Sequence, residues 1–168
     1  MDLVKELGVM AFASRLSRLS DRLKADATTL YHHRGVDFND KWFLIAYMLS
    51  KNETMTVAEI AKALGVSRPS ISQDLTEMAN HGLITVQPDE RDRRKRLLSL
   101  TYIGKEAVAA LEPVWKAVGD CTCELLTSTG KDIMKAISDI ERELERRSLF
   151  SRVVERLYGS KHEHALSS

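Results

Sequence analysis

Cysteine is scarce in this sequence, and neither sign of charge dominates it. The 168 residues carry 25 Lys and Arg against 24 Asp and Glu, a formal net charge of +1. This balance neither indicates nor excludes a nucleic-acid partner, so any such indication must come from local clusters of charge. The two cysteines, Cys121 and Cys123, stand one residue apart in a predicted helix, where their side chains point about 200° apart and cannot easily bridge. We expect them to pack as small buried or half-buried apolar groups.

Long apolar runs are also missing. No stretch approaches the ~20 apolar residues that span a bilayer, and the first residues lack the basic-then-apolar layout of a signal peptide. We therefore expect a cytoplasmic protein with no membrane partner. The content of 43% hydrophobic and 29% charged residues is that of an ordinary folded domain. At this length we expect one unit with two tasks rather than two catalytic domains.

Amphipathic helices are predicted at both ends of the chain. A heptad-like stripe, interrupted at Asp26, consists of Val9, Phe12, Leu16, Leu19, Leu23 and Leu30. Another long helix begins at Tyr102, is expected to bend near Pro113 and breaks at residues 128–130. A last helix runs from Ile133 to Leu157 with apolar residues at core spacing, and a frayed tail is expected after it.

The middle of the chain contains signals for three shorter helices. Asn39 can cap a core helix that contains Trp42. Thr56 and Glu59 have the spacing of a capping box, which predicts a short helix that ends at Gly65. Ser67 follows after a very short connection and can cap the next helix.

That last helix has two different faces. At about 100° per residue, Ile71, Leu75 and Met78 project to one side. Small and polar residues project away from them: Pro69, Ser70, Ser72, Gln73, Thr76 and Asn80. The helix is followed by two alternating strands, at residues 83–87 and 97–101, and by a highly charged loop between them at residues 89–96. The loop is too charged to bury and must protrude into solvent.

Together, residues 56–101 predict a winged helix-turn-helix on a mainly α-helical fold with a small β-hairpin wing. The major groove of DNA admits one helix, and short polar side chains let that helix approach the base edges. Gln73 is the best candidate for a bidentate contact with adenine, while Ser67 at the helix start suits a phosphate. The candidate DNA-binding residues are Ser67, Arg68, Pro69, Ser70, Ser72, Gln73, Thr76, Arg91, Asp92, Arg93, Arg94 and Lys95.

The charged loop supplies the electrostatic part of this interpretation. Arg91, Arg93, Arg94, Lys95 and Arg96 outnumber the three acids of the loop, so it can follow the DNA backbone into a minor groove. The alternative is a solvated hairpin whose charges only keep a sheet edge from pairing. The adjacent helix pair favours the DNA interpretation.

The segment TVAEIAKALGVSRPSISQDLTEMANHGLI, followed by DERDRR and LLSLTYIGKE, resembles the MarR (multiple antibiotic resistance regulator) family. The resemblance covers about residues 40–110. Asp89, Arg91, Asp92 and Arg94 match the family's wing signature position by position. The resemblance implies that Arg94 lies at the wing tip in a minor groove and that Asp92 orients the arginines of the wing.

The resemblance further implies a homodimer that places two recognition helices on a palindromic operator. The apolar stripes outside the central domain support this independently, because they need a partner and a symmetric dimer is the commonest solution; a bundle formed within one chain is the alternative. We expect residues 1–36 and 102–158 to supply dimerisation helices, residues 37–101 to bind double-stranded DNA and 159–168 to form the tail. The expected protein is a repressor that responds to a small-molecule effector.

The sequence allows three other interpretations. A redox-responsive regulator would use Cys121 and Cys123, although no histidine or cysteine spacing fits a zinc site. An enzyme would need a nucleophile with a base or paired carboxylates, and neither Ser70 nor Ser72 has a nearby histidine in sequence. A winged-helix module that docks on protein predicts binding that is insensitive to salt. We expect no catalytic residue, no metal and no cofactor.

Overall fold

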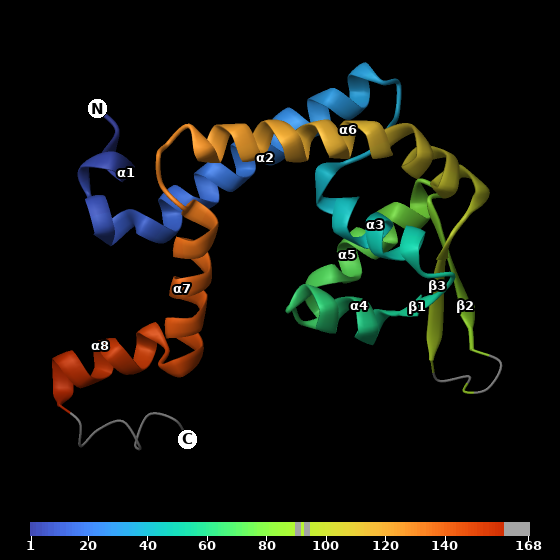
Figure 1. The fold of residues 1–168 in the computed structure, drawn as a ribbon. Helices are drawn as coiled ribbons and strands as arrows, with labels where there is room; N and C mark the ends of the chain where they lie inside the picture. Colours follow the sequence, from blue (N-terminus) through green and yellow to red (C-terminus); the bar gives the residue numbers. More distant parts are fainter. Residues whose placement is uncertain (90–91, 93–94, 160–168) are drawn as a thin grey trace. The chain divides into compact units, whose positions relative to one another are not determined.

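The computed structural model describes residues 1–89, 92 and 95–159 (Figure 1). They form, in chain order, α1 (Leu3–Glu6), the 3-10 turn η1 (Gly8–Ala11), α2 (Phe12–His33), the 3-10 turn η2 (Asp40–Trp42), α3 (Phe43–Lys51), β1 (Met55–Thr56), α4 (Val57–Leu64), α5 (Arg68–Asn80), β2 (Ile84–Pro88), β3 (Arg96–Leu100), α6 (Tyr102–Thr127), α7 (Ile133–Arg146) and α8 (Leu149–Tyr158). The chain divides into two compact units, residues 1–118 and 119–168, with the division inside α6. Within the described ranges, no helix is both long enough and apolar enough to cross a membrane.

A small antiparallel sheet accompanies the helices, which confirms the predicted fold class. Its strand order is β1-β3-β2, with Ile84 opposite Leu100 and Pro88 opposite Arg96. The hairpin was predicted to within one residue at each end. The two-residue strand β1, in which Met55 pairs with Leu98, was not predicted. Strand periodicity cannot be read from two residues.

The helix-turn-helix forms where the capping signals predicted it. Thr56 accepts a hydrogen bond from the Glu59 amide at 3.2 Å while the Glu59 carboxylate accepts from the Thr56 amide at 2.7 Å, so the capping box is complete. Gly65 ends α4 with φ of 66°, a backbone conformation that costs glycine nothing. Ser67 does begin α5, but its hydroxyl makes no capping bond to the helix and lies 2.7 Å from the Ser70 hydroxyl instead.

The core of the first unit lies between the end of α2, the segment that follows it, α3, α4, α5, the sheet and the first half of α6. Its most deeply buried large side chains are Tyr31, Phe38, Ile45, Ile60, Met78, Leu98 and Leu111. Gly104 lets α6 approach the sheet closely, since a Cβ there would lie 2.0 Å from the carbonyl oxygen of Leu83. Thr101 directly precedes α6, and its hydroxyl accepts a hydrogen bond from the Gly104 amide at 3.0 Å. The wing and α6 are therefore joined at a tight contact.

Two expectations about the C-terminal part were wrong. The single helix expected from Ile133 to Leu157 is two helices, α7 and α8. The Ser148 hydroxyl accepts from the Ser151 amide at 3.1 Å and so starts a new helix after the extended residue Arg147. Cys121 and Cys123 are both exposed rather than buried or half-buried. They lie in the last turns of α6, which have no buried residue beyond Val114.

Candidate nucleic-acid interface

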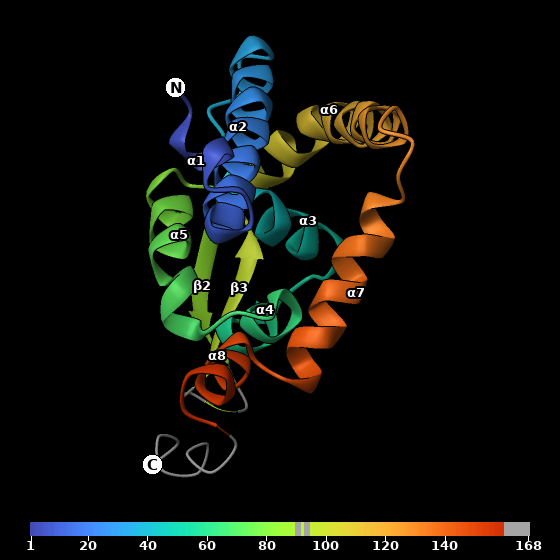
Figure 2. The same cartoon turned by 90° about the vertical axis from the view of Figure 1, so that its left-hand side faces the viewer.

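The helix α5 separates its apolar and polar residues cleanly. Ile71, Leu75 and Met78 are buried, and α5 packs against β2 (Figure 2). All seven candidate residues of this helix and its cap are exposed: Ser67, Arg68, Pro69, Ser70, Ser72, Gln73 and Thr76. A row of short polar side chains on a firmly packed helix can approach the edges of bases without long charged groups in the way.

Two hydroxyls of this row already use their hydrogens within the helix. Ser72 donates to the carbonyl oxygen of Arg68 at 3.0 Å, and Thr76 donates to that of Ser72 at 2.9 Å. Each hydroxyl therefore presents oxygen lone pairs outward, as an acceptor. Gln73 is different, because its amide nitrogen donates to the Glu77 carboxylate at 3.0 Å and its carbonyl oxygen is left to accept.

A lysine outside α5 anchors the helix and was not among the predicted site residues. Lys41, in η2, forms an ion pair with Glu77 and a second one with Asp74 at 3.4 Å. The Lys41 ammonium lowers the pKa of the Glu77 carboxyl, with a further contribution from Gln73. The same contact with Glu77 raises the pKa of Lys41. The two acids on one side of α5 were the available signal that a cation should lie opposite.

The segment that carries Lys41 is itself fixed to the core. Tyr31 donates to Asp40 at 2.8 Å, and burial together with this carboxylate raises the pKa of the Tyr31 phenol. Trp42 is buried, and its ring lies 4.9 Å from that of His81, which ends α5. His81 in turn pairs with Asp37 at 3.1 Å. The segment 37–42 thus contacts α5 at its middle and at its end.

The wing is described at its base. Its two strands are β2 and β3 of the sheet. Beyond them, the Lys95 amide donates to the Asp92 carbonyl oxygen at 2.8 Å, and the Asp89 amide donates to the Lys95 carbonyl oxygen at 3.1 Å. Lys95 is exposed and its charge lies near Glu59, whose pKa it helps to lower after the two hydrogen bonds from Thr56. The candidates Arg91, Arg93 and Arg94 lie outside the described residues.

Comparison with known proteins identifies this helix-turn-helix. Residues 35–95 match the sequence model of the MarR family. They are a MarR-family domain. The transcriptional activatory protein BadR of Rhodopseudomonas palustris is 32% identical over 94 residues. That match covers 52% of this chain and 54% of BadR, so the chain spans about half the length of this curated relative.

Solved structures of regulators share the fold over most of their length. The transcriptional repressor CouR, bound to a 23-mer DNA duplex, is 24% identical with a TM-score of 0.62, covering 81% of this chain and 96% of CouR. MOSR of M. tuberculosis, in complex with DNA, is 22% identical with a TM-score of 0.65, covering 82% and 98%. The S. aureus MepR–DNA complex is 21% identical with a TM-score of 0.67, covering 79% and 97%. These likenesses confirm the winged-helix fold of the MarR domain and its flanking helices.

Members of the MarR family are transcription regulators rather than enzymes. Among residues 1–89, 92 and 95–159, no group of three or more His, Cys, Asp or Glu side chains could hold a metal ion.

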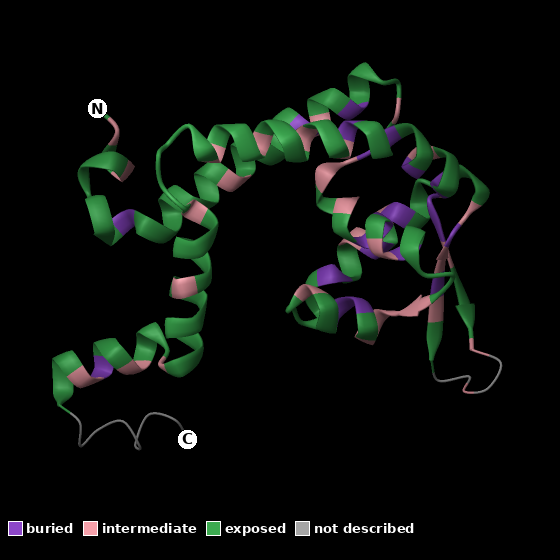
Figure 3. Ribbon diagram, in the orientation of Figure 1, coloured by how far each residue is buried: buried purple, intermediate pink, exposed green. Residues whose placement is uncertain are grey.

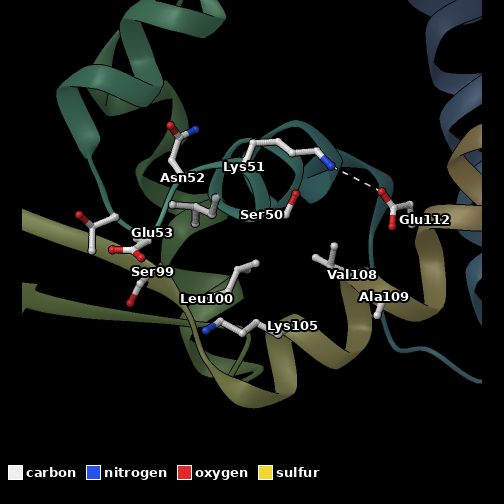
Figure 4. Close-up of a pocket in the computed structure, with 12 residues that line it drawn as sticks. Ser50, Lys51, Asn52, Glu53, Ser99, Leu100, Lys105, Val108, Ala109 and Glu112 are labelled. Atoms are coloured by element: carbon white, nitrogen blue, oxygen red, sulfur yellow. Dashed lines mark hydrogen bonds and ion pairs between the residues drawn. The ribbon is translucent and has the colours of Figure 1, made fainter.

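A pocket of about 670 Å³ lies beside the MarR domain (Figure 4). Its walls come from the end of α3, the segment that leads to β1, the strand β3 and the first turns of α6. Lys51 faces Glu112 on one side of the pocket at 3.5 Å, and Lys105 lies on the other side. A ligand here would touch the wing strand and α6 at once.

Proposed function

We propose that this protein is a sequence-specific DNA-binding transcriptional regulator that binds a palindromic operator as a homodimer. The observation that carries the proposal is the exposed face of α5, where every candidate base-contacting residue faces solvent while the opposite face is buried. The recognition helix of a helix-turn-helix lies in the major groove with such a face toward the bases. That CouR, MOSR and MepR were each solved on DNA supports the same role for this chain.

Exposed apolar residues on α2 and α7 support the homodimer. On α2, Phe12, Leu16, Leu19 and Leu23 are exposed, and α7 has no buried residue at all (Figure 3). Several large apolar side chains exposed along one helix indicate a protein-binding surface. A two-fold dimer covers such faces with copies of themselves and places two recognition helices on two half-sites about one helical turn apart.

We also propose that the protein acts as a repressor that a small organic effector releases from DNA. The pocket between β3 and α6 supports this, because a ligand that contacts both elements can change how the wing is held. CouR is a repressor and BadR an activator, so the sign of regulation needs a direct test. In a purified transcription assay on the selected operator, we expect the protein to lower transcript yield; a rise in yield would reverse the assignment.

The DNA proposal is tested by selecting fragments from a random pool of duplex DNA with the purified protein. We expect enrichment of a palindromic site and a steep fall in affinity with salt. Arg94→Ala should reduce the slope of log affinity against log salt by about 1, as expected for the loss of one cation that neutralises the DNA backbone. Lys116→Ala, which removes one positive charge from an exposed position on α6, is the matched control and should leave the slope unchanged. Absence of any enriched sequence would favour docking on protein instead.

A further inference from the structure

We infer that Glu77 is a positioning residue that fixes the side-chain amide of Gln73 and thereby sets the base that α5 prefers. The inference rests on the proposed DNA binding and goes beyond it by assigning a specificity role to two residues, Glu77 and Lys41, that need not touch DNA. Three observations carry it: the contact between Gln73 and Glu77, the anchoring of Glu77 from outside the helix, and the hydrogen-bond chemistry that remains on Gln73.

The first observation is the direction of the Gln73 amide. Gln73 and Glu77 lie one turn apart on α5, and the Gln73 Nε2 donates to Glu77 Oε1 at 3.0 Å. A carboxylate only accepts hydrogen bonds, so the nitrogen of the amide, and not its oxygen, must face Glu77. The contact therefore fixes which end of the amide points along the helix toward residue 77.

The second observation is that Glu77 is itself held in place. Its other carboxylate oxygen pairs with Lys41, which also pairs with Asp74 at 3.4 Å. The backbone of Lys41 is fixed in turn, because its amide donates to the Asn39 side chain at 3.1 Å and the next residue, Trp42, is buried. A chain of contacts thus runs from the core through Lys41 and Glu77 to Gln73. An isolated pair on a solvated helix surface would lack this anchor.

The third observation concerns what Gln73 can still offer to a base. A glutamine amide has two N–H donors and one carbonyl acceptor, and Glu77 occupies one of the donors. One N–H and the carbonyl oxygen remain, and this pair matches the N7 acceptor and N6 amino donor of adenine. Guanine presents two acceptors, N7 and O6, at the same edge, so the carbonyl oxygen of Gln73 would face a second acceptor and be repelled. The neighbours Ser72 and Thr76 cannot supply the missing donor, since their hydrogens are bonded within the helix.

The test compares base preference rather than affinity. Sites selected by the full-length protein first give the operator, and Gln73→Ala then shows at which base pair Gln73 acts. Binding to operators that carry each of the four base pairs at that position is measured for the wild type and for Glu77→Ala, Glu77→Gln and Lys41→Met. The control is Glu106→Ala, which removes one negative charge from an exposed position of α6.

We expect the wild type to prefer adenine over guanine at that position by roughly tenfold, within the range of one bidentate contact. Glu77→Ala should remove most of this preference, and Lys41→Met should weaken it in part. Glu77→Gln keeps an acceptor for Gln73 and should retain more of the preference than Glu77→Ala. Loss of an acid near DNA raises affinity for all sequences alike, so a general change in affinity does not imitate a change in preference.

The outcomes separate the two proposals. If the wild type selects a site, but Glu77→Ala keeps the full preference or Gln73→Ala alters no base pair, the positioning role is overturned and DNA binding stands. If the wild type selects no site at all, the proposed function fails and this inference fails with it. An equal loss of preference in Glu106→Ala would also overturn the assignment to Glu77.

Discussion

Apolar side chains have different surroundings in the helix-turn-helix and in the two C-terminal helices. In the former, Ile71, Leu75 and Met78 of α5 are buried at helical spacing. In α7, Ile137, Ile140 and Leu144 have similar spacing but remain at least 40% exposed. Helical periodicity therefore marks a surface that will be buried, but it does not say by what. The first surface is covered within its own unit, and we propose that a second copy of the chain covers the other.

The largest effect is expected where burial is complete. Met78 is 0% exposed, and Met78→Ala should lower the free energy of unfolding by about 3 kcal/mol, because it loses apolar burial and leaves a cavity. Met10, which is 85% exposed, is the matched control, and Met10→Ala should change it by less than about 0.5 kcal/mol. Urea unfolding measures both values. A comparable loss for Met10→Ala would show that the N-terminal segment is buried in the assembled protein.

A charge on α7 should break the dimer and leave the helix-turn-helix folded. Ile140→Glu places a carboxylate on the apolar stripe, and we expect the dimer to weaken by roughly a hundredfold, since the charge would be buried without a partner. Ser138 lies about 160° away around the helix, so Ser138→Glu adds the same charge to the opposite face and should leave the dimer intact. Sedimentation across protein concentrations measures both. A dimer that tolerates Ile140→Glu would place the interface elsewhere.

Two glycines of α6, the buried Gly104 and the exposed Gly119, allow covered and uncovered positions to be compared within one helix. At Gly104 an added Cβ would meet the Leu83 carbonyl oxygen, so Gly104→Ala should destabilise the protein by about 2 kcal/mol. At Gly119 no atom of the described residues would lie within 4 Å of an added Cβ, and Gly119→Ala should stabilise the protein by about 0.8 kcal/mol through helix propensity. Thermal unfolding should therefore shift in opposite directions. A gain in stability for Gly104→Ala would show that the approach of α6 to the wing can relax.

The features that the sequence predicted depend on neighbouring residues. The capping box of Thr56 and Glu59, the turn at Gly65 and the faces of α5 all follow from residues within one or two turns of each other. The ion pair of Lys41 with Glu77 could be predicted only in part. Asp74 and Glu77 on one side of α5 indicate a nearby cation, but which residue supplies it depends on contacts that only the folded chain makes. The break between α7 and α8 had a local signal in Ser148, but the apolar periodicity on both sides obscured it. The exposure of Cys121 and Cys123 depends on whether anything covers α6 there, which no local pattern reveals.

The smallest expected effect is a loss of stability at acid pH, which has different causes in the helix-turn-helix and in α7. Hydrogen bonds from the Thr56 amide and hydroxyl lower the pKa of Glu59, and a hydrogen bond from Arg152, with Arg146 nearby, lowers the pKa of Glu143. A carboxylate whose folded pKa lies below its ordinary value of 4.5 stabilises the fold above that pH. This stabilisation is lost as the pH falls from 4.5 through the folded pKa.

Salt then distinguishes the two carboxylates. The partner of Glu143 is a charged guanidinium on an exposed surface, so added salt should weaken that contribution, whereas the partners of Glu59 are mainly uncharged and should be little affected. Unfolding between pH 3 and 6 at low and high salt, with Glu59→Gln and Glu143→Gln, measures the difference. Each variant should reduce the dependence of the free energy of unfolding on pH in this range. The stability lost in Glu143→Gln should be smaller at high salt, whereas the stability lost in Glu59→Gln should be the same at both salt concentrations. Equal salt sensitivity at both sites would mean that the charge of Lys95, rather than the capping bonds, dominates at Glu59.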